Sequence, residues 1–237
     1  MQSLWDDKAA TACNNDPLAL RVYSSRLIGR EADLVLHGGG NTSVKTREKD
    51  LFGDTHETIH VKGSGWDLVS IEAGGFAPLR LDALIRLSQL PTLSDPDMVR
   101  SMRAALLDPS APNPSVEAIL HAIIPFKFVD HSHADAVVTL TNTQKGEKHI
   151  HAVYGQRVLV MPYVMPGFEL AKKFASMTRD IDWTGLEGMV LMGHGLFTFA
   201  DDVRQSYERM IGLVTEAEQY IQAAPPAAAT RGGTGHH

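Results

Sequence analysis

The sequence predicts an α/β fold in which helices pack around a mixed central sheet. Segments with apolar residues at helical spacing alternate along the chain with short runs typical of strands. Hydrophobic residues make up 43% and charged residues 21% of the 237 residues, as in ordinary globular domains. The sequence shows no internal repeat and no linker before residue 223. We therefore expect one domain over 1–222.

Caps and turn residues delimit the expected elements in the first half of the chain. Asp16 can cap a helix over 16–29, which ends at Gly29. A short apolar run over 33–36 leads into a triple-glycine turn that lies between two strand-like pieces. A strand over 57–66 then runs into a second glycine-rich turn. Three helices follow from apolar spacing and first-turn residues: 80–90, 96–107 (opened by Asp95 and Pro96), and 115–124 with Ser115 as its cap.

Short strands alternate with helices in the second half. Residues 127–133 alternate between apolar and polar side chains, and 157–163 is a second apolar run, so both are expected strands. Residues 188–200 form two strand pieces around a Gly-His-Gly turn. Helices are expected over 134–142, 168–177 and 201–222. The low-complexity residues 223–237 are predicted to be a flexible tail or a linker remnant.

Charge and composition exclude several classes of function. A formal net charge of −6 argues against a nucleic-acid partner, which needs a basic surface. No apolar run is long enough to span a membrane, and the N-terminus lacks the basic and apolar parts of a signal peptide. The lone Cys13 cannot form an intramolecular disulfide, as is usual in a reducing compartment. A cytoplasmic protein without a membrane partner is expected.

Three histidines are the candidate metal ligands. His131 and His133 lie two residues apart on a predicted strand, so both imidazoles point to the same face. A catalytic zinc site takes three protein ligands and leaves one position open. His194 is the candidate third ligand, because the glycines on both sides of it leave room for a ligand. The pair alone is equally consistent with two partly exposed histidines, and imidazole ligands also accept manganese, cobalt or iron.

Two further histidine pairs are expected to lie at the surface. His149 and His151 are two residues apart, and His56 and His60 are four apart. Both pairs lie in polar surroundings, and neither has a partner framed by glycines. These two pairs show that histidines close together in the sequence do not by themselves indicate a metal site.

Glu117 is the candidate general acid or base. It is expected one turn into the helix over 115–124, among apolar residues and just before the predicted metal strand. Burial and a nearby metal could tune the pKa of such a carboxylate for proton transfer. The alternative is that this glutamate only complements the helix dipole, which is common in a first helical turn.

Two glycine-rich turns could hold an anion. Residues 38–43 (GGGNTS) and 62–65 (KGSG) offer backbone N–H groups, hydroxyls and an amide. Lys62 adds a positive charge that is better suited to counter a phosphate than to act as a nucleophile. Neither turn has the spacing of a P-loop or a dinucleotide site, and each could be only a hairpin. Together with a metal site, they favour a phosphorylated substrate.

Six motifs in order resemble those of the class II aldolase/adducin family: GGGNTSV, KGSGWDL, PSVEAILH, HSHADAV, MPYVMPG and GHGLFTF. The resemblance extends over residues 16–222 and is closest to the aldolase part of bifunctional rhamnulose-1-phosphate aldolase/alcohol dehydrogenases. It implies a three-layer α/β/α sandwich with a mainly antiparallel sheet. It also implies a homotetramer with four-fold symmetry and sites between subunits.

The resemblance also implies roles for individual residues. His131, His133 and His194 match the zinc ligands of the family, and Glu117 matches its acid/base. Five residues match the positions that hold the substrate phosphate: Gly40, Asn41, Ser64, Gly65 and Ser115. Val116 departs from the serine of some members, and neither Tyr154 nor Tyr163 is assigned as the tyrosine proton donor of some aldolases.

The implied reaction is the reversible cleavage of a ketose 1-phosphate, L-rhamnulose 1-phosphate in the closest members, to dihydroxyacetone phosphate and lactaldehyde. Bifunctional members continue into a short-chain dehydrogenase domain. Residues 223–237 lie about where the linker to such a domain would begin. The family also contains sugar-phosphate 4-epimerases, a dehydratase and decarboxylases with similar metal sites, which remain alternatives. A non-catalytic adducin-like interaction module is a further alternative, which the presence of all the expected ligands disfavours.

Overall fold

A seven-stranded sheet in the order β3-β2-β1-β4-β7-β6-β5 forms the centre of the computed structural model, which describes residues 1–224. Neighbouring strands are antiparallel except β5 and β6, which are parallel. The strands are β1 (Asn41–Lys49), β2 (Thr55–Lys62), β3 (Phe76–Arg80), β4 (Phe128–Ser132), β5 (Val158–Met161), β6 (Gly188–Leu191) and β7 (Gly195–Ala200).

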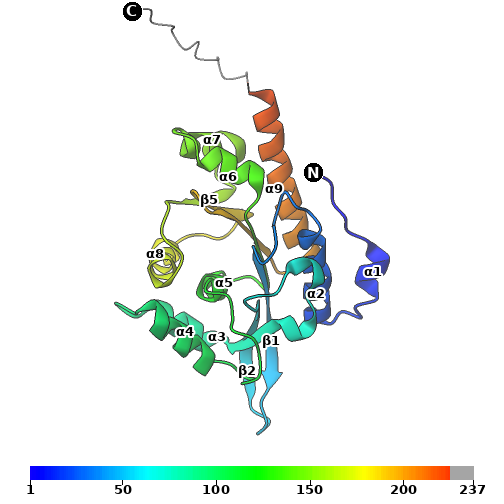
Figure 1. Cartoon of the computed structure of the whole chain (residues 1–237), viewed down its shortest axis with the longest axis vertical. Coiled ribbons are helices and arrows are strands. Elements are labelled where there is room, and N and C mark those ends of the chain that lie inside the picture. Colours follow the sequence, from blue (N-terminus) through cyan, green and yellow to red (C-terminus); the bar gives the residue numbers. More distant parts are fainter. Residues whose placement is uncertain (225–237) are drawn as a thin grey trace, which may run out of the picture.

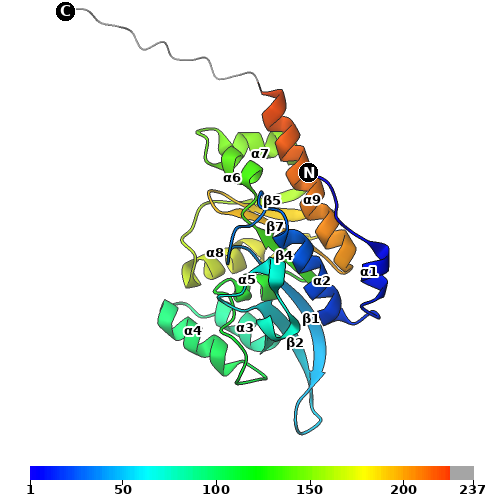
Figure 2. The same cartoon turned by 45° about the vertical axis from the view of Figure 1, so that its right-hand side comes forward.

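Helices cover both faces of this sheet (Figures 1 and 2). They are α1 (Asp7–Thr11), α2 (Pro17–Gly29), α3 (Leu81–Ser88), α4 (Asp95–Ala104), α5 (Ala118–Ile123), α6 (Asp135–Thr141), α7 (Gly146–Tyr154), α8 (Phe168–Thr178) and α9 (Val203–Ala223). Two short 3-10 turns, η1 (Leu68–Ser70) and η2 (Ala73–Gly75), precede β3. None of the helices within residues 1–224 is long and apolar enough to cross a membrane.

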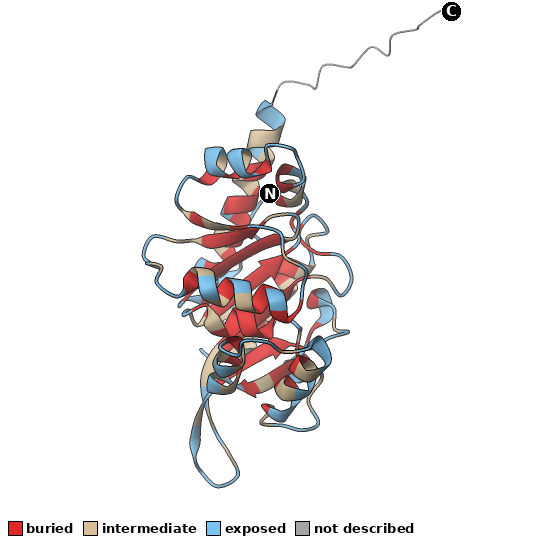
Figure 3. Ribbon diagram, turned by 90° about the vertical axis from the view of Figure 1, so that its left-hand side faces the viewer, coloured by how far each residue is buried: buried red, intermediate tan, exposed pale blue. Residues whose placement is uncertain are grey.

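Alternation along the inner strands builds two hydrophobic cores. In β7, Phe197 and Phe199 pack with α3, α4, α5 and α8, whereas Leu196 packs with α2, α6, α7 and α9. Successive side chains of a strand point to opposite faces of the sheet, so each face has its own core. The residues of both cores are buried (Figure 3). The predicted three-layer α/β/α sandwich with a mainly antiparallel sheet is thereby confirmed.

Most predicted elements are present, with local corrections. The expected apolar strand piece at 33–36 is a turn at 33–34 followed by irregular backbone, and α1, β3 and α7 were not anticipated. Glu117 lies at the N-cap position before α5 rather than one turn inside a helix, and Ser115 is not the cap. His60 lies on β2 with only 7% of its surface exposed, so its expected surface position is wrong. From residue 225 on, the predicted tail lies outside the described residues.

The β1–β2 hairpin projects from the body of the molecule (Figures 1 and 3). Its outer end is exposed, and the strands become buried toward the sheet, as the burial of β2 from His56 to Lys62 shows. The buried end of the hairpin brings Asn41 and Lys62 to one edge of the domain.

A buried ion pair connects β1 to β4 on the face covered by α2 and α9. The guanidinium of Arg21, on α2, donates to Asp130 of β4 and to the backbone carbonyls of Ser43 and Val129, at 3.2 and 3.4 Å. Asp130 also accepts a hydrogen bond of 2.6 Å from Ser206 of α9. Both charged side chains are fully buried, so each depends on the other for compensation.

We expect Asp130→Ala to lower the free energy of unfolding by about 3–5 kcal/mol, because it leaves the Arg21 guanidinium buried without a carboxylate. Urea denaturation measures this loss. Asp7→Ala is the matched control, since Asp7 forms an exposed ion pair with Arg204 and its removal should change stability little. Equal effects of the two substitutions would contradict the importance of the buried pair.

Candidate metal centre and substrate pocket

Three imidazoles converge at one end of the sheet. His131 lies on β4, His133 follows one residue after the end of this strand, and His194 lies in the turn between β6 and β7. One nitrogen of each ring lies within 4.8 Å of a nitrogen of the other two. The convergence predicted from the sequence is present, and the group could hold a metal ion.

The sheet positions these side chains within narrow limits. β4 pairs with β7 so that His131 lies opposite Phe197, whose ring stacks on the imidazole at 4.1 Å between centroids. Gly195 comes immediately after His194. A Cβ on Gly195 would lie 2.3 Å from the carbonyl oxygen of Ser132 and 3.1 Å from the His131 ring. A larger residue at this position would therefore displace β4.

The state of His131 fits a metal ligand. Its Nδ1–H donates to the carbonyl of Leu196 at 3.0 Å, which leaves Nε2 as a bare lone pair. This Nε2 atom is buried and has no hydrogen-bond partner among the described residues. Burial lowers the pKa of His131 to about 3, so the ring is neutral, as metal binding requires.

Glu117 lies between two of the three imidazoles. Its carboxylate oxygens are 2.8 Å from Nε2 of His194 and 3.3 Å from Nε2 of His131, and its side chain is almost fully buried. Burial alone would raise its pKa. At the acidic pH where Glu117 titrates, the charge of a protonated His131 and the hydrogen bonds from His194 and Asn41 hold the pKa of Glu117 well below its usual range. The carboxylate is therefore ionised and lies within reach of both a metal and a substrate proton.

Backbone hydrogen bonds bring Glu117 to the second glycine-rich turn. The N–H of Ser115 donates to the carbonyl of Lys62 at 3.1 Å, and the N–H of Ser64 donates to that of Asn113 at 2.8 Å. These bonds pair the segment before α5 with the end of β2. Chain segments about fifty residues apart therefore form one wall of the site.

A pocket of about 330 Å³ opens beside the imidazoles. It contains all five predicted phosphate-binding residues, together with Glu117 and two of the histidines. It is lined by Gly38, Gly39, Gly40, Asn41, Lys62, Ser64, Gly65, Ser115, Val116, Glu117, His133, Pro166 and His194. His131 is not among the lining residues, since its ring is fully buried.

Lys62 and the first glycine-rich turn form another part of the pocket wall. Lys62 is only 3% exposed, and its ammonium donates to the carbonyl of Gly38 at 3.2 Å. Burial lowers the pKa of Lys62, whereas the charges of Asp67 and Glu117 act in the opposite direction. Gly40 has a φ of +68°, and a Cβ on it would come within 2.8 Å of the His131 carbonyl oxygen. The first glycine-rich turn can therefore approach β4 closely only with glycine at position 40.

The two tyrosines considered from the sequence differ in position. Tyr154 is buried in α7, where its hydroxyl donates to the carbonyl of Leu213, away from the pocket. Tyr163 is 58% exposed, and its ring would be 3.4 Å from a Cβ at Gly193, beside His194.

The sequence interpretation missed His121 and the contact between Asn41 and Glu117. Nδ2 of Asn41 donates to Glu117 at 2.6 Å, and Oδ1 of Asn41 lies 2.5 Å from Nε2 of His121. A signal for His121 was available, since it follows Glu117 by four residues in an otherwise apolar segment.

A family model described as "Class II Aldolase and Adducin N-terminal domain" matches residues 20–221. The chain is 37% identical over 221 residues to the "Uncharacterized oxidoreductase YuxG" of Bacillus subtilis (strain 168), covering 93% of this chain. It spans only 32% of the length of that relative.

Solved structures show the same architecture. The N-terminal class II aldolase domain of a conserved protein from Thermoplasma acidophilum superposes with a TM-score of 0.85 at 41% identity, covering 93% of this chain and 99% of that domain. L-fuculose-1-phosphate aldolase from Thermus thermophilus gives a TM-score of 0.54 at 16% identity, covering 87% of this chain and 98% of the aldolase. At that identity the likeness shows a shared fold.

We expect His133→Ala to weaken binding of a divalent metal by more than about 100-fold, because one of the three converging imidazoles is lost and alanine offers no ligand atom. Metal content after dialysis and titration with Zn²⁺ measure this. His151→Ala is the control, since His151 is an exposed histidine on α7 from the other His-X-His pair. Retention of the metal by the His133 variant would rule out this ligand set.

Glu117 should also make the metal-free protein sensitive to acid. Its pKa is lowered in the folded state, so its stabilising contribution is present above about pH 4.5 and is lost as the pH falls below that value. Between about pH 6 and about pH 3.5, the wild type should lose of the order of 1 kcal/mol more stability than Glu117→Gln. Urea denaturation at the two pH values tests this, and parallel losses would contradict it.

Proposed function

The chain belongs to the class II aldolase/adducin family, and from this premise we propose that it is a metal-dependent aldolase acting on a ketose 1-phosphate. The observation that carries the proposal is the pocket itself. The ionised Glu117, two of the three clustered imidazoles, the buried Lys62 and the hydroxyl groups of Ser64 and Ser115 line one pocket. Such a pocket suits a substrate with a carbonyl near one end and a phosphate at the other.

We assign the metal position to His131, His133 and His194, with zinc as the preferred ion. These residues would hold a divalent cation, which would supply Lewis-acid stabilisation of negative charge that develops on the substrate oxygens. Manganese, cobalt or iron could take the same ligands. The bare, neutral Nε2 of His131 supports this assignment.

Glu117 is the proposed acid/base. In the cleavage direction the bond between C3 and C4 of the ketose breaks, and its electron pair remains on the C3 side while C4 leaves as an aldehyde. As C4 becomes an aldehyde, its hydroxyl group loses a proton, which the ionised Glu117 accepts, and the carboxylic acid so formed gives a proton to C3. In the condensation direction the carboxylate removes the proton from C3 and returns one to the oxygen on C4. The distance of 2.8 Å between Glu117 and Nε2 of His194 supports this role, because a substrate bound beside the histidines would lie within reach of the carboxylate.

The phosphate group is proposed to bind at the glycine-rich end. Gly40, Ser64, Gly65 and Ser115 offer backbone and hydroxyl donors, and Lys62 supplies the charge. Asn41 lies between this end and Glu117, so its amide orients the substrate chain between the phosphate and the reacting carbons.

Within this class we propose L-rhamnulose 1-phosphate as the substrate and dihydroxyacetone phosphate and lactaldehyde as the products. We further propose that the chain acts in the cytoplasm as a homotetramer. A fusion to a short-chain dehydrogenase agrees with the name and the greater length of the Bacillus relative, of which this chain spans about a third. Gel filtration with light scattering tests the assembly.

Another metal-dependent reaction on a sugar phosphate is the second candidate, because epimerases, dehydratases and decarboxylases of the family share a similar site. A panel of ketose 1-phosphates with added zinc separates these activities. Release of dihydroxyacetone phosphate, detected by a coupled reduction, supports the aldolase. Interconversion of two sugar phosphates, or loss of water or carbon dioxide, would replace it. A chain that neither binds metal nor turns over any substrate would support an interaction module.

We expect Glu117→Gln to keep its metal but to lose turnover by about 100-fold or more, because the amide cannot transfer the proton. Steady-state kinetics together with metal analysis measure both effects. Glu147→Gln, at an exposed position on α7, is the control and should behave as the wild type. Unaltered turnover in the Glu117 variant would remove this residue from the mechanism.

A further inference from the structure

A chain of buried hydrogen bonds leads from β1 through α5 to Glu117. Ser43 Oγ lies 2.7 Å from Nδ1 of His121, and Nε2 of His121 lies 2.5 Å from Oδ1 of Asn41. Nδ2 of Asn41 in turn lies 2.6 Å from the carboxylate of Glu117. Ser43 and His121 are fully buried, and His121 is not among the residues that line the pocket.

Chemistry gives this chain a single direction. An ionised carboxylate only accepts hydrogen bonds, so Asn41 presents its NH₂ group to Glu117 and its carbonyl to His121. Nε2 of His121 must then carry the proton, and Nδ1 must be the acceptor of the Ser43 hydroxyl. The three donors therefore point in sequence toward the carboxylate, and reversing any one of them leaves a buried polar group unpaired.

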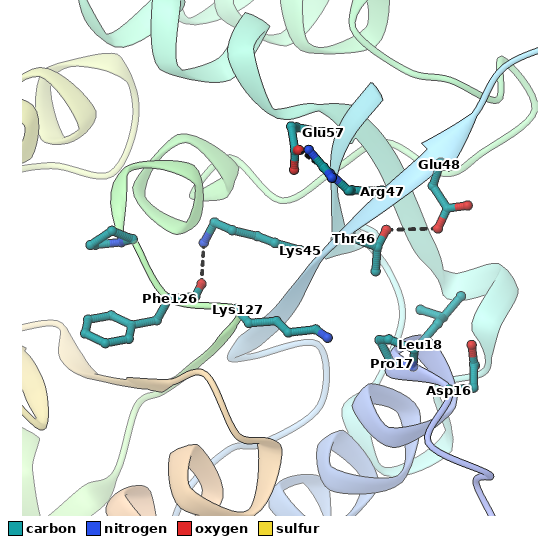
Figure 4. A pocket seen from close by; sticks show the side chains of 11 residues that line it. Asp16, Pro17, Leu18, Lys45, Thr46, Arg47, Glu48, Glu57, Phe126 and Lys127 are labelled. Atoms are coloured by element: carbon teal, nitrogen blue, oxygen red, sulfur yellow. Dashed lines mark hydrogen bonds and ion pairs between the residues drawn. The ribbon is translucent and has the colours of Figure 1, made fainter. Parts of the chain in front are cut away.

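The strand and helix that carry the chain are held together at the opposite end by Lys45. Residues 41, 43 and 45 lie on one face of β1, and all three contact the α5 region. The Lys45 side-chain nitrogen donates to the carbonyls of His121 and Ile124 at 2.9 and 2.7 Å. It also donates to the carbonyl of Phe126 at 2.7 Å, as Figure 4 shows. Hydrogen bonds to these carbonyls satisfy the C-terminal end of the short helix α5 and fix the height of His121 along β1.

We propose that His121 is a positioning residue for the proton transfer by Glu117, acting through the amide of Asn41. This inference rests on the acid/base role in the proposed function. His121 does not touch the substrate position, since Asn41 lies between it and the pocket. With an orientation set by His121, the Asn41 amide cannot turn its carbonyl toward the carboxylate, where it would repel Glu117 and shift it from the reacting carbon.

The tautomer of His121 tests the proposal without any substrate. In a two-bond ¹H–¹⁵N correlation spectrum of the full chain, His121 should be protonated at Nε2 only, and the side-chain NH₂ protons of Asn41 should exchange slowly with solvent. In Ser43→Ala, the loss of the donor to Nδ1 should reduce both features. A proton on Nδ1 of His121 in the wild type would overturn the proposal, whatever reaction the protein catalyses.

Kinetics test the consequence for catalysis. His121→Phe should lower kcat about 10–100-fold, with KM and metal content changed less than about 3-fold, because the acid/base is displaced while the binding groups remain. His121→Gln retains a donor and an acceptor and should recover most of kcat. It also keeps the test valid if the phenylalanine variant does not fold. His60→Phe is the control, since His60 is a buried histidine on β2 that contacts Thr46 and Glu48.

The possible results distinguish the positioning role of His121 from the proposed aldolase reaction. A wild type with no aldolase activity but the expected His121 tautomer would refute the proposed reaction and leave the hydrogen-bond chain in place. Equal losses of kcat in the phenylalanine and glutamine variants, or a loss confined to KM, would refute the positioning role. Unchanged kcat in His121→Phe would do the same.

Discussion

The pairing of β1 with β4 is the constraint on which the rest of the structure depends. In this register Asn41 lies opposite His131, so the amide that contacts Glu117 and the innermost imidazole are adjacent by backbone geometry. A shift by one residue would turn each side chain to the opposite face. Behind the pair, the Arg21–Asp130 ion pair binds the carbonyls of both strands and opposes such a shift.

The two faces of these strands carry different tasks. The face toward α2 and α9 holds Arg21 and Asp130 as mutually compensated charges, whereas the face toward α5 holds neutral or donor groups around a single carboxylate. Because the imidazole of His131 is kept neutral by burial, the ionised Glu117 is the anion nearest the site. The lone pair on Nε2 of His131 is thus available to bind a cation, and the part of the pocket wall that carries Lys62 is available to bind an anion.

The positions of the functional groups also explain how one family scaffold can serve several reactions. The histidines and Glu117 belong to the sheet end and the segment before α5, whose backbones are paired with neighbouring strands. Val116, Pro166 and the exposed Tyr163 belong to loops around the pocket or beside it. Substitutions in such loops can change the substrate without disturbing the core, because loops carry few of the packing contacts.

From the sequence alone follow the fold class, the convergence of the three histidines and most of the residues around the pocket. Those signals are local. Two histidines at the strand period share a face, glycines beside His194 leave space, and capping residues such as Asp16 begin helices. Local patterns failed where burial depends on a distant segment. His60 lies on a predicted strand but was expected at the surface, whereas it is buried, and 33–36 is apolar without being a strand.

How the carboxylate of Glu117 is held follows from the tertiary structure alone. Glu117, Asn41 and His121 meet because backbone hydrogen bonds join the segment before α5 to the end of β2 and because β1 lies beside β4. Their direct contacts span 76 and 80 residues of sequence, and spacing along the chain does not encode such contacts. The tautomer of a buried imidazole follows from what lies on both sides of its ring, and that environment exists only once the sheet has formed.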